Sequence, residues 1–280
     1  MKGIGYQIRK NFLEKFLDLT WTTLDQAEWR IRLHSAQFDS STGHSEPILF
    51  YLNRNKLNIV KGHLTNAYKP TQYWLERGKT YRDRFRYNRN SKLQEKMLLD
   101  YLKSIIPPFK SVLELGCGFG RITKLILSNF PDIQVYTAVD LSPHQIQNAR
   151  EYLISGTSNN VISDGISLEF IVSDIKSLQT NKKYDLVISV EVLLHVLPSE
   201  ITDIISKLAS LSYHHIINLD YYQEKPDFLA PHNFLHQYEN IYNELPSISG
   251  VKRVIIEKKG IFSNVNTKQS IFHATTRNRS

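Results

Sequence analysis

The residues whose spacing most clearly implies chemistry lie in the stretch V-L-E-L-G-C-G-F-G-R at 112–121. An apolar run typical of a buried strand leads directly into three alternating glycines, Gly116, Gly118 and Gly120. Glycine allows positive φ angles and has no Cβ, so a ligand can lie against bare backbone where the strand ends. The spacing differs from the dinucleotide motif G-x-G-x-x-G, because Arg121 occupies the position of the third glycine of that motif. No G-K-[S/T] phosphate loop is present in this stretch. The stretch predicts a small-molecule pocket and disfavours a nicotinamide dinucleotide.

Carboxylates follow the next two predicted strands. Asp140 stands in A-V-D-L-S at the end of the second predicted strand, 26 residues beyond Glu114. A carboxylate at that strand tip can accept hydrogen bonds from both hydroxyl groups of a ribose. Asp174 stands in V-S-D-I after the third strand. Either acid alone could be a helix N-cap or a solvated loop residue. Their recurrence at consecutive strand ends favours a nucleoside site.

These residues require a sheet whose strands end side by side. From Ser111 onward, short β-branched runs alternate with amphipathic runs of helical length, which predicts a doubly wound α/β fold with a mostly parallel sheet of seven strands. The last two runs are joined by a Gly-containing stretch too short for a helix, so the last strand should pair antiparallel. The expected strands are S-V-L-E-L, Q-V-Y-T-A-V, S-L-E-F-I-V, Y-D-L-V-I-S-V, H-H-I-I-N-L, V-K-R-V-I-I-E-K and Q-S-I-F-H-A-T-T.

The chain before this domain reads as a helical extension. Apolar residues at helical spacing over 8–34 predict a helix, followed by a loop at F-D-S-S-T-G-H-S-E-P. Further helices are expected over about 73–85 and over 91–106, the latter ended by Pro107-Pro108. We therefore expect an N-terminal helical lid or substrate region at 1–90 and a catalytic domain at 91–280.

The glycine stretch resembles the first motif of class I S-adenosylmethionine-dependent methyltransferases, E/D-x-G-x-G-x-G, and the resemblance covers roughly residues 91–280. It implies a Rossmann-like fold and S-adenosyl-L-methionine as cofactor. It also implies a ribose-binding acid at Asp140, with Leu141 beside it, and adenine contacts at Asp174 and the Ile175 backbone. The residues implied along the methionine part of the cofactor are Glu114, Gly116, Cys117, Gly118 and Gly120.

The exit of the fourth strand, E-V-L-L-H, resembles the E-V-L-x-H motif of the small-molecule branch of that family. Glu191 and His195 are four residues apart, so a short helical turn would direct both to the pocket mouth, with Glu191 toward the cofactor. His195 could act as a general base, or it could only pack against the loop. The N/D-P-P-Y/F and Pro-Cys signatures of nucleic-acid base methyltransferases are absent here.

Two further histidines occur in H-N-F-L-H-Q-Y after the fifth strand. A helix over this segment would place His232 and His236 on one face, as candidate acceptor-side bases or as ordinary surface residues. No third ligand accompanies them, so a zinc site is disfavoured and no metal is expected. Tyr221 and Lys225 have the Y-x-x-x-K spacing of short-chain dehydrogenases, but Pro226 removes Lys225 from helical geometry.

The segment Y-W-L-E-R-G-K-T-Y-R-D-R-F-R-Y at 73–87 mixes arginine with aromatic residues. In many members of the family the helices before the first strand lie over the cofactor, which implies that Tyr73, Arg77 and Tyr81 close the pocket and that an arginine holds the cofactor carboxylate. Simple packing on the core, or contact with a nucleic-acid backbone, are the alternatives.

Composition limits the classes of protein. Hydrophobic residues make up 41% and charged residues 22% of 280 residues, which indicates a folded globular chain. No apolar stretch could span a bilayer, and the N-terminus lacks the features of a secretory signal. With the single Cys117, these features predict a cytoplasmic protein without membrane partners. The net charge of +8 lies within residues 1–90, which hold 16 Lys/Arg and 8 Asp/Glu.

The sequence thus favours a methyltransferase that acts on a hydroxyl or amine of a small molecule of sugar or natural-product type. The alternative within the fold is methylation of RNA or another macromolecule held by the basic N-terminal region. A non-catalytic cofactor-binding module and an aminopropyltransferase-type enzyme also remain open. A homodimer is compatible with the sequence, which does not identify the oligomeric state.

Overall fold

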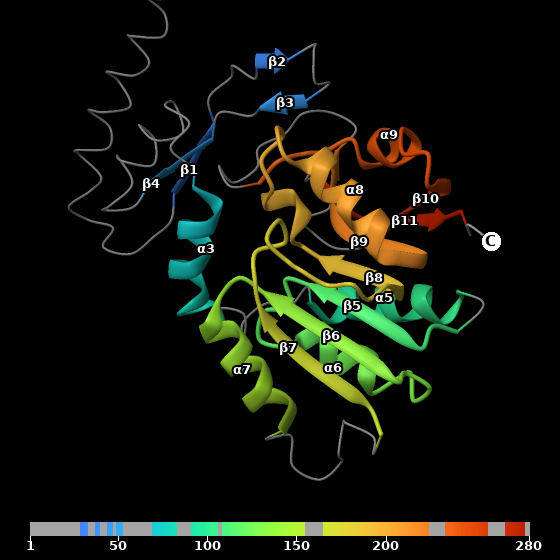
Figure 1. Cartoon of the computed structure of the whole chain (residues 1–280). Coiled ribbons are helices and arrows are strands. Elements are labelled where there is room, and N and C mark those ends of the chain that lie inside the picture. The colour runs from blue at the N-terminus through green and yellow to red at the C-terminus, as the bar shows by residue number, and fades with distance from the viewer. Residues whose placement is uncertain are drawn as a thin grey trace, which may run out of the picture. The chain divides into compact units, whose positions relative to one another are not determined.

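The computed structural model describes residues 69–82, 91–105, 108–154, 165–223, 233–256 and 267–277, together with the backbone of four short strands before residue 53 (Figure 1). The chain divides into two compact units. The first contains residues 1–36, 47–68 and 228–231, and the second contains 37–46, 69–227 and 232–280.

The described residues before residue 53 are extended rather than helical. In the first unit β1 (Trp29–Arg32) pairs antiparallel with β4 (Leu49–Leu52), and the second unit contains a hairpin of β2 (Gln37–Asp39) and β3 (His44–Glu46). The predictions of a helix through residue 34 and of a loop at 38–47 are therefore wrong at these strands. The sequence W-R-I-R alternates apolar and charged residues with a period of two, which suits a strand better than a helix.

One mixed sheet of seven strands forms the centre of the second unit, in the order β10-β11-β9-β8-β5-β6-β7. The predicted doubly wound sheet is confirmed, and its final strands are antiparallel as expected: β11 pairs antiparallel with both β9 and β10. The strands are β5 (Ser111–Leu115), β6 (Val135–Asp140), β7 (Ser167–Val172), β8 (Tyr184–Val190), β9 (Ser212–Gln223), β10 (Ile248–Ile256) and β11 (Thr267–Thr276).

The strand order reverses between β5 and β8, which pair in parallel with Glu114 opposite Ile188. From β5 the chain proceeds through β6 to β7 on one side, and from β8 to β9 on the other. In open α/β sheets, ligands bind outside the carboxyl ends of the strands at such a reversal. The glycine stretch follows β5 and the E-V-L-L-H stretch follows β8, so the topology brings the two motifs to this point.

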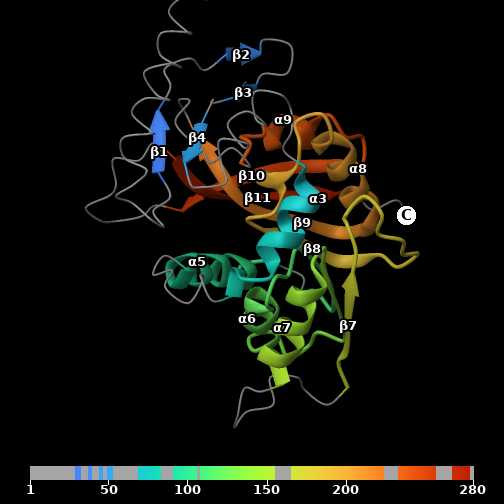
Figure 2. The same ribbon diagram turned by 90° about the vertical axis from the view of Figure 1, so that its left-hand side faces the viewer.

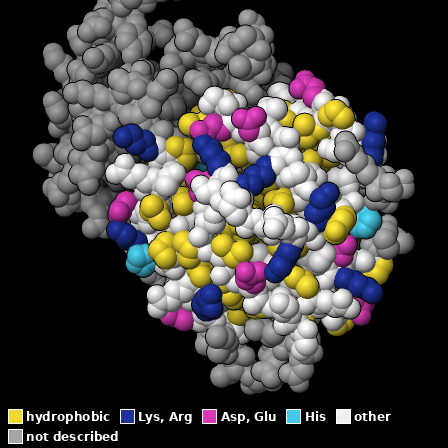
Figure 3. Space-filling model, viewed as in Figure 1, with side chains coloured by type: hydrophobic (Ala, Val, Ile, Leu, Met, Phe, Trp, Pro, Cys, Tyr) yellow, Lys and Arg dark blue, Asp and Glu magenta, His cyan; other side chains and the backbone are white. Residues whose placement is uncertain are grey.

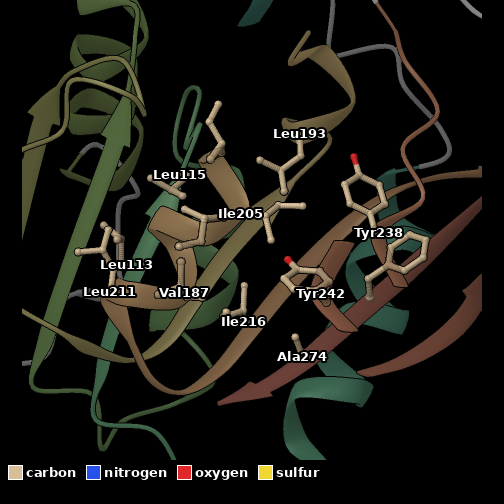
Figure 4. Close-up of a cluster of buried hydrophobic side chains, with 14 of the residues drawn as sticks. Leu113, Leu115, Val187, Leu193, Ile205, Leu211, Ile216, Tyr238, Tyr242 and Ala274 are labelled. Carbon is tan, nitrogen blue, oxygen red and sulfur yellow. The ribbon is translucent and has the colours of Figure 1, made fainter. Parts of the chain in front are cut away.

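Helices cover both faces of the sheet, and each face has its own apolar core. One core packs α5 (Ser91–Lys103), α6 (Arg121–Leu127) and α7 (Pro143–Ile154) against the sheet. The other packs α8 (Ile201–Leu211) and α9 (Tyr238–Asn243) on the opposite face (Figure 4). Both cores extend to the strand tips, which fixes the positions from which the site residues project.

A separate helix, α3 (Pro70–Gly78), lies across the carboxyl ends of the strands (Figures 1 and 2). Proline at its first turn suits a helix start. At its end the backbone oxygen of Gly78 accepts a hydrogen bond of 3.0 Å from Gln145 Nε2. A Cβ on Gly78 would lie 2.4 Å from Ser142 Oγ, so the close approach of α3 to the start of α7 requires glycine. We refer to α3 as the lid helix because it lies across this edge of the sheet.

The surface of the described part shows lysine and arginine side chains interspersed with acidic and apolar ones (Figure 3). Residues 91–280 hold 19 Lys/Arg and 19 Asp/Glu, which agrees with this mixed surface. None of the helices described is both long and apolar enough to cross a bilayer.

Candidate functional site

The glycine loop after β5 leaves a space beside its backbone. Gly116, Gly118 and Gly120 have φ angles of +66°, +55° and +87°. A Cβ on Gly116 would lie 2.4 Å from Val192 Cγ2, and one on Gly120 would lie 3.2 Å from the Ala149 Cβ, whereas nothing lies within 4 Å of a Cβ on Gly118. Gly116 and Gly120 therefore serve packing within the protein, and Gly118 borders open space at the strand reversal.

Asp140 at the end of β6 joins this loop to the second strand. Its Oδ2 accepts a hydrogen bond of 2.8 Å from the Gly118 amide, and its Oδ1 accepts one of 2.8 Å from the Ser142 amide. Burial raises the pKa of Asp140, and the two amide donors oppose that shift. Each carboxylate oxygen has a second lone pair for a further donor. The carboxylate therefore stands next to the open space beside Gly118.

Glu114 lies beneath the loop and not beside the open space. It is 2% exposed, and its Oε2 accepts hydrogen bonds from Thr123 Oγ1 (2.5 Å) and from the Tyr136 hydroxyl (2.7 Å). Burial raises the pKa of Glu114 to about 7, while these donors and Arg121 lower it and Asp140 raises it. Glu114 thus ties β5 to β6 and α6 from within the core.

The backbone of Cys117, rather than its thiol, helps to hold the glycine loop in place. Its amide donates to Val139 O (3.0 Å), which holds the glycine loop on β6. The side chain is buried, and burial raises the pKa of the thiol, with further increases from Glu114 and Asp140. A buried thiol kept neutral in this way is inert as a nucleophile.

The loop after β7 contacts the lid helix. Asp174 is half-buried; its Oδ1 accepts from the Lys176 amide (2.8 Å) and its Oδ2 lies 3.5 Å from Thr71 Oγ1 of α3. Ile175 packs against the core next to it, and Leu141 is half-buried after β6. Asp140 and Asp174 therefore stand at the tips of adjacent strands, β6 and β7.

The segment after β8 differs from the expected helical turn. A 3₁₀ turn, η1, spans only Leu193–His195, and Glu191 before it has a φ of +57°. Glu191 and His195 therefore do not share a helical face. Gln269 Nε2 donates to Glu191 Oε1, whereas the imidazole of His195 lies against the indole of Trp74 on α3, with ring centroids 4.2 Å apart.

Aromatic and charged groups of the lid segment gather near the same strand ends. The ring centroid of Trp74 lies 5.1 Å from that of Tyr73 and 6.4 Å from that of Tyr81. Burial raises the pKa of the Tyr81 hydroxyl to about 12; the charge of Glu191 also raises it, and the charges of Arg121 and Arg77 lower it. Tyr81 thus lies among charges from the lid and from the glycine loop.

The predicted helix over 232–238 is wrong where the structure describes it, because residues 233–237 are not helical and α9 begins at Tyr238. His232 lies outside the described residues. His236 is 5% exposed, and its Nε2 lies 3.1 Å from both Leu193 O and Val196 O. Within the described ranges, no three His, Cys, Asp or Glu residues are grouped as metal ligands.

Sequence reasoning missed several residues of this region. Arg121 is held by Glu95 Oε1 (2.9 Å) and Gln94 Oε1 (2.7 Å) of α5. Asp220 on β9 is fully buried beneath η1, where its Oδ1 accepts from the Leu194 amide at 3.4 Å. The N-L-D stretch within β9, with two polar residues on one face of an apolar run, is the signal that could have revealed Asp220.

Comparison with known proteins supports the resemblance. Residues 112–212 match a family model described as a methyltransferase domain. A malonyl-[acyl-carrier protein] O-methyltransferase of Acetivibrio thermocellus is 39% identical over 106 residues, which is 37% of this chain and 34% of that protein. A putative methyltransferase of Invertebrate iridescent virus 6 is 35% identical over 136 residues, 48% of this chain and 42% of that one. The chain thus spans about a third to two fifths of these relatives.

Solved structures extend the likeness to the whole domain. The magnesium protoporphyrin IX methyltransferase of Synechocystis, with a TM-score of 0.55 and 19% identity, covers 75% of this chain and is itself covered to 99%. The N-methyltransferase NodS of Bradyrhizobium japonicum has a TM-score of 0.55 and 18% identity, with coverage of 76% and 100%. At these identities the likeness concerns the fold. Residues 112–212 therefore match the methyltransferase domain family, and the domain that contains them has the fold of these methyltransferases.

Proposed function

We propose that this chain is an S-adenosylmethionine-dependent methyltransferase that transfers a methyl group to a hydroxyl or amine of a small molecule. The observation that carries the proposal is the open space beside Gly118, bordered by the Asp140 carboxylate at the strand reversal. A side chain at residue 118 would fill this space. Bare backbone next to a carboxylate suits a nucleoside with two free ribose hydroxyls.

The nucleoside half of the cofactor would lie along the tips of β6 and β7. In the proposal Asp140 accepts hydrogen bonds from the ribose, and Asp174 with the Ile175 backbone contacts the adenine, next to Leu141. The Thr71 hydroxyl on α3 lies within 3.5 Å of Asp174, so the lid helix reaches the same strand tip. Residues from three segments could therefore enclose the nucleoside.

The amino-acid half of the cofactor carries one carboxylate and one ammonium group. Charges of both signs act on the buried hydroxyl of Tyr81: Arg121 and Arg77 lower its pKa, whereas Glu191 raises it. In the proposal Arg77 faces the carboxylate and Glu191 the ammonium, with Tyr81 between lid and loop. Tyr73 closes the same side through its contact with Trp74.

The sulfonium group of the bound cofactor would supply an activated methyl for in-line displacement by the acceptor. The chain's part is to align the two reactants and to exclude water. The His195 imidazole, held at the end of the η1 turn, would remove the proton from the acceptor. Glu114 supports the loop from beneath, because its carboxylate is fully buried and bonded to Thr123 and Tyr136.

A small-molecule acceptor is favoured over RNA. Of the four proteins reported above, one is named for malonyl-[acyl-carrier protein] and one for magnesium protoporphyrin IX. The segment shared with the malonyl relatives covers 37% of this chain, so their acceptor is not carried over to it. The mixed charges of residues 91–280 give this domain no net basic character.

Calorimetry of the full chain with S-adenosylmethionine and S-adenosylhomocysteine tests the proposal. We expect binding of both, and we expect Asp140→Asn to weaken it about tenfold or more, because a charged hydrogen-bond acceptor is lost. Asp203→Asn, at an exposed position of α8, is the matched control and should bind like the unaltered chain. Absence of heat with both compounds would overturn the proposal.

Two further measurements separate the other classes of protein. Decarboxylated S-adenosylmethionine should bind more weakly than the intact compound, because Arg77 would lose its carboxylate partner; tighter binding would indicate an aminopropyltransferase. Formation of S-adenosylhomocysteine on incubation with small-molecule extracts is expected. Binding without such turnover in any extract would indicate a non-catalytic module.

A further inference from the structure

The η1 turn that carries His195 is held by side chains from outside the turn. His236 Nε2 lies 3.1 Å from the carbonyl oxygens of both Leu193 and Val196. Carbonyl oxygens only accept, so Nε2 must carry a hydrogen that it donates to the first residue of the turn and to the residue that follows it. The imidazole of His236 is buried, which keeps water from competing for those carbonyls.

Asp220 holds the same turn by accepting a hydrogen bond from a backbone amide of the turn. Its Oδ1 accepts from the Leu194 amide at 3.4 Å, and its Oδ2 accepts from Asn218 Nδ2 at 2.9 Å. Asn218 Oδ1 in turn accepts from the Tyr242 hydroxyl at 3.0 Å. Three buried polar side chains thus form a chain of hydrogen bonds from α9 to the turn.

The location of Asp220 is costly. The carboxylate is 0% exposed, and the η1 residue Leu193 belongs to the apolar cluster that also contains Tyr238 and Tyr242 (Figure 4). An apolar residue of similar size would often serve stability as well or better than a buried charge. Packing alone therefore does not explain a carboxylate that accepts a hydrogen bond from the backbone amide next to His195.

The two sides of the turn face different partners. On the inner side are Asp220, His236 and the Phe234 amide, which donates to Leu194 O at 2.6 Å. On the outer side the His195 ring lies against Trp74 of the lid helix. The contacts on the inner side therefore hold the backbone from which the His195 ring reaches Trp74.

We propose that Asp220 and His236 are positioning residues, which hold the η1 turn so that the His195 imidazole lies at the acceptor side of the site. Neither side chain needs to touch cofactor or acceptor for this role. The consequence for methyl transfer rests on the proposed function, in which His195 is the base. Displacement of such a group by about 1 Å costs roughly a hundredfold in rate, so a rigid turn matters.

Fluorine NMR of the full chain labelled with 5-fluorotryptophan tests the proposal without the acceptor. The chain has three tryptophans, and Trp74→Phe identifies the Trp74 resonance. His195→Ala gives the change in that resonance when the neighbouring ring is lost. We expect Asp220→Ala and His236→Leu to shift or broaden the Trp74 resonance by more than its line width, as His195→Ala does.

An exchange of two side chains separates positioning from general packing. In Asp220→Asn alone, the amide nitrogens of residues 218 and 220 would oppose one another, and the Trp74 resonance should move. In the double variant N218D/D220N, the residue-218 carboxylate accepts from both the Tyr242 hydroxyl and the residue-220 amide, and the residue-220 oxygen still accepts from Leu194. The double variant should restore the original resonance.

The result that overturns the proposal is a Trp74 resonance that stays in place in D220N, or one that the double variant fails to restore. These variants keep the volume of the core, so the test holds even if Asp220→Ala does not fold. S-adenosylhomocysteine binding is measured on the same samples. If the Trp74 resonance behaves as expected but no S-adenosylhomocysteine binds, the proposed function is contradicted and the positioning role stands. If S-adenosylhomocysteine binds but the Trp74 resonance does not behave as expected, only the positioning role is contradicted.

Discussion

The indole of Trp74 and the imidazole of His195 pack with their ring centroids 4.2 Å apart and their planes inclined by 46°. The two residues come from the lid helix α3 and from the η1 turn after β8. Aromatic contacts of this kind contribute about 0.5–1.5 kcal/mol beyond the area that they bury. The contact therefore couples the position of the lid to the turn that bears the proposed base.

Removal of the indole should loosen the lid and weaken cofactor binding. We expect Trp74→Ala to raise the dissociation constant for S-adenosylhomocysteine about fivefold, as the loss of roughly 1 kcal/mol implies, and Trp74→Phe to have a smaller effect. Calorimetry measures both. Tyr213→Ala is the control, because Tyr213 is 52% exposed at the start of β9, and it should leave binding unchanged. Equal affinity in Trp74→Ala would show that α3 is no lid.

A methyl group at residue 118 should block the cofactor with little effect on the fold. Gly118 and Gly165 both have positive φ angles, of +55° and +102°, and a Cβ on either meets nothing within 4 Å. Alanine costs about 1–2 kcal/mol of backbone strain at the left-handed φ of Gly118 and more at the wider φ of Gly165. We therefore expect Gly118→Ala to lose no more thermal stability than Gly165→Ala, and we expect loss of S-adenosylhomocysteine binding in Gly118→Ala alone. Retained binding in Gly118→Ala would argue against a cofactor beside this loop.

The sheet could be predicted from the sequence because its strands are short, β-branched and separated by helix-length runs. The runs 167–172 and 184–190 match β7 and β8 at both ends. The helix expected at 232–238 does not form in its described part, where contacts with the η1 segment hold the chain instead. The Phe234 amide donates to Leu194 O, and the His236 imidazole bonds to Leu193 O and Val196 O. Such contacts join distant segments, and periodicity cannot reveal them.

The candidate site could be predicted only where one motif specifies it. The glycine spacing and the acids at strand tips predicted that Gly118, Asp140 and Asp174 follow neighbouring strands, and β5, β6 and β7 are adjacent and parallel in the sheet. Spacing alone could not show that Glu114 lies inside the core, because residue type does not reveal which side of a strand faces the ligand. The Trp74 contact with His195 depends on how α3 docks, which is a tertiary property.

The histidine pair between β9 and β11 should destabilise the fold in acid. His215 Nδ1 lies 3.0 Å from His273 Nε2, and Tyr101 bonds the other ring nitrogen of His273 at 2.9 Å. Burial lowers the pKa of His273 to about 4, with the charges of His215 and Lys252 adding to the effect. The unfolded chain therefore binds an additional proton between about pH 6.5 and 4, and the free energy of unfolding falls as pH decreases through that range.

Urea denaturation at pH 7 and pH 5 checks this prediction. His273→Asn should lose less of its stability between the two values than the unaltered chain does. His144→Asn, at an exposed position of α7, should lose as much as the unaltered chain. An identical loss in His273→Asn would mean that the pair does not contribute to the acid sensitivity.

Glu114 should make the pH dependence of stability run in the opposite direction. Burial raises the pKa of its carboxyl from 4.5 to about 7, against the hydrogen bonds from Thr123 and Tyr136. The folded chain then binds more protons than the unfolded chain between these two values, so its free energy of unfolding falls as pH rises from about 4.5 to 7 and changes no further above that. One such proton corresponds to about 1.4 kcal/mol for each pH unit at most.

Glu114→Gln tests both this slope and the place of Glu114 in the site. The amide oxygen can still accept from the two hydroxyls, so the variant should fold, lose the Glu114 share of the slope between pH 4.5 and 7, and equal or exceed the unaltered chain in stability at pH 8. Denaturation at a series of pH values gives the difference in the free energy of unfolding between Glu114→Gln and the unaltered chain. The opposing contribution of His273 is present in both and cancels in this difference. Because Glu114 is 2% exposed, S-adenosylhomocysteine affinity should be unchanged. A constant loss of stability at every pH would contradict the titration, whereas a large loss of affinity would mean that the carboxylate reaches the cofactor.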